Sequence, residues 1–188
     1  MDIRVYLNNG DVLDFSQNDP ALVQATLAEM HAGKLFSGTS LILGCGAACT
    51  ILQPSAISRI DLQMAELPPV SYTLSDNVTL IEDDEVFRVR AKAATSAFRE
   101  GVAPGEQYVG YLHFEMAGGH RLMFELQRVL RNQIQFFTNL NRLLQMPVMV
   151  FPHPRGGVVY VNVANVVSIG AAPGFAEYPK GAWLVESL

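Results

Sequence analysis

The stretch of the chain best suited to binding chemistry is the loop 151–157, with the sequence Phe-Pro-His-Pro-Arg-Gly-Gly. Two prolines stiffen this loop, and two glycines let backbone N–H groups turn toward a ligand. The guanidinium of Arg155 supplies a positive charge, so a small anion or a protein partner is the expected ligand. A rigid hairpin loop without any ligand is the simpler interpretation of the same residues. The candidate binding residues are His153, Arg155, Gly156 and Gly157.

Three histidines, His113, His120 and His153, lie in the second half of the chain, and histidine is a common zinc ligand. His113 falls on the strand face expected to meet solvent, whereas His120 falls beside a turn on the core-facing side. None of the three belongs to a paired ligand motif. We therefore predict no metal site.

Cys45 and Cys49 flank the expected turn of a hairpin. They lack the Cys-x-x-Cys spacing of a redox pair, so we expect two small apolar side chains. The sequence also contains no Gly-Lys-Ser/Thr phosphate loop, no Gly-x-Ser-x-Gly elbow and no His-Glu-x-x-His motif. It therefore assigns no catalytic residue and no cofactor, and it favours a protein that is not an enzyme.

The composition is that of a globular protein, with 49% hydrophobic and 16% charged residues in a chain of 188. The net charge of −5 weighs against nucleic acids and anionic membranes, because both attract a concentrated positive field. The N-terminus lacks the basic start and apolar run of a signal peptide. No run approaches the roughly 18 apolar residues of a membrane helix. We expect a soluble, cytoplasmic protein.

A β-hairpin is predicted at the N-terminus, because apolar and polar residues alternate on both sides of an Asn-Asn-Gly turn. A two-residue turn would mix the core face with the solvent face. In a three-residue turn, Gly10 takes the left-handed conformation and Val5 lies opposite Leu13. Arg4 then lies opposite Asp14, so this register satisfies both faces.

The same pattern returns 109 residues later, which indicates an internal repeat. Gly119 takes the place of Gly10 in the turn. The charged pair reappears as Glu115 opposite Arg121, with the two charges exchanged. Further along the chain, 50–53 corresponds to 159–162.

A helix is expected between the strands of each copy. In the first copy, Asn18 or Asp19 can cap the helix and Pro20 suits its first position. In the second copy, the apolar period ends before Pro147. The expected apolar stripes are Leu22, Val23, Thr26, Leu27 and Met30 in the first helix and Val129, Leu130, Ile134, Phe137, Leu140 and Leu144 in the second.

Residues 65–107 match neither copy and carry eight acidic against four basic residues. Two apolar stretches, 78–81 and 86–90, flank the acidic run 82–85, so the insert is predicted to be a hairpin with an acidic tip. Residues 108–171 carry five basic against two acidic residues. The two regions can dock on each other, although two separately solvated faces are the favoured interpretation.

The predicted fold class is therefore α+β. It consists of two repeated β-β-α-β-β-β units, each an antiparallel sheet with one helix, related by pseudo-twofold symmetry around an acidic β-rich insert. The expected divisions are 1–64 for the first repeat, 65–107 for the insert, 108–172 for the second repeat and 173–188 for a C-terminal tail that packs across a neighbouring surface.

Duplicated sheets leave strand edges that another subunit can cover. We therefore expect a non-enzymatic binding or scaffolding protein that self-associates as a homo-oligomer. One alternative is RNA or other nucleic-acid binding through Arg155 and a basic second helix, which the acidic net charge disfavours. Another is small-molecule or anion binding, or an enzyme, at a groove between the repeats. A deep pocket with titratable groups from both halves would favour that groove. The arginines assigned to the second helix are Arg128, Arg131 and Arg142.

Overall fold

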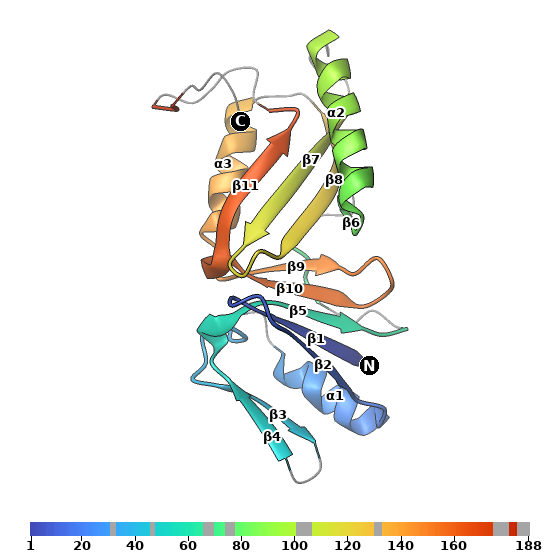
Figure 1. Cartoon of the computed structure of the whole chain (residues 1–188), viewed down its shortest axis with the longest axis vertical. Helices are drawn as coiled ribbons and strands as arrows, with labels where there is room; N and C mark the ends of the chain where they lie inside the picture. Colours follow the sequence, from blue (N-terminus) through green and yellow to red (C-terminus); the bar gives the residue numbers. More distant parts are fainter. Residues whose placement is uncertain are drawn as a thin grey trace.

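The computed structural model describes residues 1–30, 33–45, 48–65, 70–73, 78–100, 107–129, 133–174 and 181–183. The chain is α+β, with several antiparallel sheets and few helices. Within the described residues, the strands form a five-stranded sheet, a four-stranded sheet and a separate two-stranded hairpin. Figure 1 shows the four-stranded sheet at one end of the molecule, the five-stranded sheet across the middle and the hairpin at the other end.

The first half of the chain contributes the strands β2-β1-β5, in that order, to the five-stranded sheet and forms the separate β3–β4 hairpin. Helix α1 is capped by the Asp19 carboxylate, which accepts hydrogen bonds from two backbone N–H groups, and it begins with Pro20 as expected. The elements of the first half are β1 (Asp2–Leu7), β2 (Val12–Ser16), α1 (Pro20–Glu29), β3 (Leu41–Cys45), β4 (Ala48–Leu52), a 3₁₀ turn (Pro54–Ala56) and β5 (Ile57–Gln63).

The second half places its strands in the same chain order and pairs them with each other in the same way. Strand β7 pairs with β8 and β11, and β9 pairs with β10. The difference is that β10 also pairs with β5 of the first half, whereas β4 has only β3 as a neighbour in the described residues. The elements are β7 (Gln107–Met116), β8 (Arg121–Val129), α3 (Gln133–Leu144), β9 (Val148–Pro152), β10 (Val158–Asn162), a 3₁₀ turn (Val163–Asn165) and β11 (Val166–Ala172).

Both predicted hairpin registers are confirmed. Val5 lies opposite Leu13 and Arg4 opposite Asp14, with the Arg4 Nε 2.6 Å from a carboxylate oxygen. Gly10 has a φ of +96°, which is the left-handed conformation the turn requires. In the second hairpin, Glu115 lies opposite Arg121, and the closest oxygen and nitrogen atoms are 2.7 Å apart.

The insert is not the predicted acidic hairpin, so the expectation of a β-rich insert is wrong. It contains the strand β6 (Val78–Ile81), which pairs with β8, and then the 17-residue helix α2 (Asp84–Glu100). The Asp83 carboxylate accepts hydrogen bonds from the N–H groups of Glu85 and Val86. The acidic run therefore begins a helix instead of forming the turn of a hairpin. Phe87 and Ala91 then pack against the sheet.

Helix α2 also covers the face of β7 that was expected to meet solvent. Tyr111 and Met123 are buried in a small cluster with Ile81 and Ala91, and the ring of Phe87 packs edge to face on Tyr111. Among the described residues, three ion pairs join the insert to the second half: Arg90–Glu125, Arg121–Asp84 and Arg155–Glu82. The insert therefore docks on the second half, and the favoured interpretation of two separate solvated faces is wrong.

The predicted helix stripes are only partly right. In α1, Met30 is buried just beyond the helix, but Leu22 is 52% exposed. In α3, Leu140 packs against the core as predicted, but Leu143 is buried in place of Leu144, which is 45% exposed. Strand β8 extends to Val129, which was assigned to the helix. The expected Leu130 lies outside the described residues, and in the tail Trp183 is 95% exposed rather than packed on a neighbour.

Two large apolar cores occupy the two halves, and β10 contributes to both. The first core, around Val5, Ile60 and Leu62, also holds Val158 and Tyr160 of β10. Successive side chains of a strand point to opposite faces, so the alternate residues of β10 enter the second core. The second core contains Phe114, Phe124, Phe151, Val159 and Val161. The hairpin β9–β10 thus holds the two halves together.

Candidate functional site

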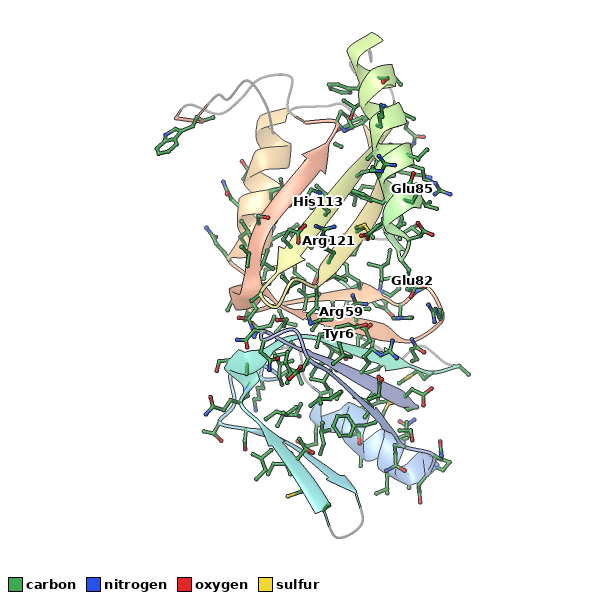
Figure 2. The ribbon with its side chains drawn as sticks, in the orientation of Figure 1. Tyr6, Arg59, Glu82, Glu85, His113 and Arg121 are labelled. Carbon is green, nitrogen blue, oxygen red and sulfur yellow. The ribbon has the colours of Figure 1, made fainter. Side chains whose placement is uncertain are left out.

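A buried ion pair lies on β5 where the two halves meet. The Nε and one terminal nitrogen of the Arg59 guanidinium donate to the two carboxylate oxygens of Asp61, at 2.5 and 2.6 Å, and the two residues are 8% and 2% exposed. The guanidinium also lies 4.6 Å from the centre of the Tyr6 ring. Bidentate bonding offsets the cost of removing both charges from water. Figure 2 shows Tyr6 and Arg59 together at this junction.

His153 is buried beside this pair. Its Nε2 lies 3.8 Å from a carboxylate oxygen of Asp61, and its Nδ1 accepts a hydrogen bond from the backbone N–H of Arg155. Acceptance at Nδ1 leaves the proton of the neutral ring on Nε2, facing the carboxylate. Burial lowers the pKa of His153 below its ordinary value, and the negative charge of Asp61 offsets part of that effect.

The two glycines of the 151–157 loop allow close packing on β5. A Cβ at Gly157 would lie 1.9 Å from the backbone oxygen of Leu62, and a Cβ at Gly156 would lie 2.7 Å from that of Met64. The N–H of Gly156 donates to the carbonyl of His153. The amides of Arg155 and Gly156 thus donate hydrogen bonds within the loop.

A cleft of about 440 Å³ lies between the junction and the insert. Arg155 lies at this cleft and forms a 2.9 Å ion pair with Glu82, while Arg121 pairs with Asp84 at 3.5 Å. Figure 2 shows Glu82 and Arg121 just above Tyr6 and Arg59. The lining residues are Tyr6, Arg59, Leu80, Ile81, Glu82, Asp84, Gly119, His120, Arg121, Leu122, Met123 and Arg155.

His120 is the unsatisfied polar group of this cleft. Its Nε2 is buried without a hydrogen-bond partner, and its ring meets the ring of Tyr6 edge to face, with centroids 5.0 Å apart. An unpaired buried ring nitrogen costs free energy unless a water or a ligand reaches it. The cleft therefore combines cationic groups, carboxylates and one free hydrogen-bonding atom from both halves of the chain.

The arginines of the nucleic-acid alternative do not share one helix. Arg128 lies in β8, opposite Tyr108, and the prediction that it belongs to the helix is wrong. Arg142 is exposed in the last turn of α3, and Arg131 lies outside the described residues. Arg155 is engaged with Glu82.

The histidines and cysteines also lie in separate surroundings. His113 packs near Phe87 and over Gly170, whereas His153 lies beside the Arg59–Asp61 pair. Among the residues that the structure describes, no three His, Cys, Asp or Glu side chains come together as metal ligands. Cys45 ends β3 and Cys49 lies exposed on β4.

Sequence reasoning missed the buried pair and the cleft. Arg59 and Asp61 alternate with Ile60 and Leu62, a pattern normally typical of a strand with one solvated face. Two opposite charges at i and i+2 of a strand were the available signal. Their burial depends on the second half of the chain, which no local pattern reveals.

Comparison of the chain with protein-family models, with curated proteins and with solved structures gives no match. No helix in the described part of the chain is both long enough and apolar enough to span a membrane.

Proposed function

We propose that this chain is a non-enzymatic scaffolding or binding protein that works in the cytoplasm as a homo-oligomer. The observation that carries the proposal is that the β3–β4 hairpin exposes large apolar side chains to solvent. It forms a sheet of its own and exposes Ile42 and Ile51, which are 62% and 64% accessible. A two-stranded hairpin that turns apolar side chains of one face to water is unfavourable, and a further chain can cover that face.

The proposal includes the internal duplication. Both halves run strand, strand, helix, strand, strand, 3₁₀ turn and strand, and the two 3₁₀ turns, 54–56 and 163–165, differ by the same 109 residues as the hairpins. A pseudo-twofold relation would pair β4 with β11 as well as β10 with β5. The described strands form the second pair alone, so we propose that the two units follow each other head to tail.

The test of this function is the mass of the wild-type protein in solution. Size-exclusion chromatography with light scattering is expected to give a multiple of the 20.6 kDa chain mass, with the average mass rising with concentration if exchange is fast. A mass of 20.6 kDa at every concentration would contradict the proposal.

Binding of a small anion in the cleft is a second candidate function. It is favoured by the free Nε2 of His120, which lies in one cleft with the guanidinium groups of Arg59 and Arg121. An oxyanion can accept hydrogen bonds from all three groups when His120 carries its proton on Nε2. This proposal keeps Arg155 as a binding residue, because an anion can replace Glu82 as its partner.

Thermal denaturation with inorganic phosphate tests this second function, with sodium chloride at equal ionic strength as the reference. Phosphate is expected to raise the Tm of the wild type because it binds the folded state. The rise should be lost in Arg121→Gln, which removes a cation of the cleft. Equal rises in the two proteins, or no rise in the wild type, would contradict phosphate binding at this site.

A further inference from the structure

We propose that β4 of one chain pairs antiparallel with β11 of a second copy, in the register that joins β10 to β5 inside each chain. This inference rests on the proposed function, because it specifies how the homo-oligomer is built. Its basis is that each chain already contains one such contact, the pairing of β10 with β5 between its two halves, which we call the internal joint.

The internal joint shows what such an interface needs. In it, Tyr160 lies opposite Ile60 and Val158 opposite Leu62, and all four side chains are at most 2% exposed. These side chains of β10 enter the core of the other half. The alternate side chains, Val159 and others, stay in the core of their own half.

The β3–β4 hairpin has the same two faces, but one of them is uncovered. Leu41, Leu43 and Leu52 pack against the core of their own half. Ile51 lies opposite Ile42, just as Tyr160 lies opposite Val150 in the second half. Val150 and Tyr160 are 3% and 2% exposed, whereas Ile42 and Ile51 are 62% and 64% exposed.

Strand β11 is the matching uncovered edge. Its counterpart β5 has neighbours on both sides, and Ile60 and Leu62 are fully buried. Strand β11 has only β7 as a neighbour in the described residues, and Ile169 and Ala171 are only partly buried. Val167 is 71% exposed on the same strand. An edge with unpaired backbone groups and apolar side chains accepts a further strand readily.

The two open edges of one chain cannot pair with each other. Figure 1 shows the β3–β4 hairpin at one end of the molecule and β11 along the sheet at the other end. The partner is therefore a second copy of this chain. Because the two surfaces differ, the contact repeats from chain to chain and yields a ring or a filament.

Transfer of the internal register by 109 residues gives the residue pairs of the interface. Tyr160 opposite Ile60 becomes Ile51 opposite Ile169, and Val158 opposite Leu62 becomes Cys49 opposite Ala171. Directly opposed residues of an antiparallel pair have Cα atoms about 4.5–5.5 Å apart. That separation suits a disulfide bond.

The experiment is disulfide formation in the full chain with Cys45→Ser and Ala171→Cys, under mild oxidation. Cys49 is then the only native thiol, and it is exposed. We expect loss of the monomer band on a non-reducing gel and a ladder that continues beyond the dimer. The matched control is Cys45→Ser with Ala172→Cys, whose new thiol faces the other side of β11 and should leave the monomer band intact.

A second variant covers the case in which Ala171→Cys does not fold. Leu52 and Ser168 are opposed in the same register, and Ser168 is exposed, so Leu52→Cys with Ser168→Cys in a chain lacking Cys45 and Cys49 should give the same ladder. Cross-linking of Cys45→Ser alone would show β4 pairing with β4 and overturn the inference.

The possible failures are distinguishable. An oligomer by light scattering that gives no ladder with either variant would overturn the β4–β11 joint and leave the proposed function standing. A strict monomer would overturn both.

Discussion

The two hairpins β9–β10 and β3–β4 occupy the same place in the two halves but have opposite surroundings. The first is inserted between two cores and is almost entirely buried. The second is a sheet of its own, and alternate residues of β4 are exposed. Both have one apolar face turned to their own half, so the difference lies in whether another sheet covers the second face.

This difference teaches that exposure in one chain can mark a missing neighbour. Ile51 and Tyr160 both lie on the outward face of their hairpin, yet they differ from 64% to 2% exposed. The burial of Tyr160 requires β5 of the other half. The internal joint is therefore the template for the proposed contact between chains.

The largest expected effect comes from removing the buried member of this pair. Tyr160→Ala should lower the free energy of unfolding by about 3–5 kcal/mol, as truncation of a buried aromatic residue does. Ile51→Ala, its exposed counterpart, should change it by less than about 0.5 kcal/mol in dilute, monomeric protein. Urea denaturation followed by circular dichroism measures both values.

Equal losses in the two variants would contradict the difference between the hairpins. A second comparison of Tyr160→Ala with Ile51→Ala is made at high protein concentration, where the chains are assembled. There Ile51→Ala should also become destabilising, because the interface between chains is then part of the folded state.

The next effect concerns the charges at the joint. Arg59→Met leaves Asp61 buried without its partner and should cost about 3–5 kcal/mol of unfolding free energy. Arg4→Met breaks the pair with Asp14 on the same sheet, where the side chains are 47% and 64% exposed, and should cost about 1 kcal/mol or less. Chemical denaturation of both variants checks the ratio, and a similar cost for the two would show that the joint does not exclude water.

The double variant Arg59→Met with Asp61→Leu sharpens this test. Replacing both charges by apolar groups removes the unpaired carboxylate, so the double variant should recover much of the stability that Arg59→Met loses. A double variant as unstable as the single one would mean that the pair is needed for more than mutual neutralisation.

The smallest effect is a pH dependence from His153. Because its pKa in the folded protein lies below the ordinary value of 6.5, the unfolded chain binds more protons as the pH falls through 6.5. The folded state should thus lose stability on acidification, by at most about 1.4 kcal/mol per pH unit. His153→Gln should flatten this slope in denaturation between pH 5 and 7. An unchanged slope would assign the dependence to another group.

The parts of the fold that could be predicted from sequence are the local ones. The pairing of Val5 with Leu13 follows from one turn and the alternation around it, so no distant contact is needed. The stretch 86–90 was misassigned because Val86, Phe87 and Val89 fit a strand and a helix about equally. The helix prevails because Asp83 caps it and Phe87 and Ala91 share its buried face.

The candidate site depends on contacts that sequence patterns do not encode. Arg155 was identified from its loop, but its partner Glu82 lies 73 residues away. Gly157 was identified as a candidate binding residue from the same loop, but the loop sequence does not reveal that a Cβ there would collide with the backbone of β5. His120 was assigned to the core-facing side, and its place in a cleft beside Tyr6 comes from the packing of one half on the other.

The most direct test of the central claim is light scattering on Ile51→Lys, with Leu22→Lys as the matched control. Both substitutions place a charge at an exposed apolar position, 64% and 52% accessible, but only Ile51 lies on the proposed edge. We expect a 20.6 kDa monomer for Ile51→Lys and the wild-type mass for Leu22→Lys. An unchanged oligomer in Ile51→Lys would contradict the claim that this hairpin joins one chain to the next.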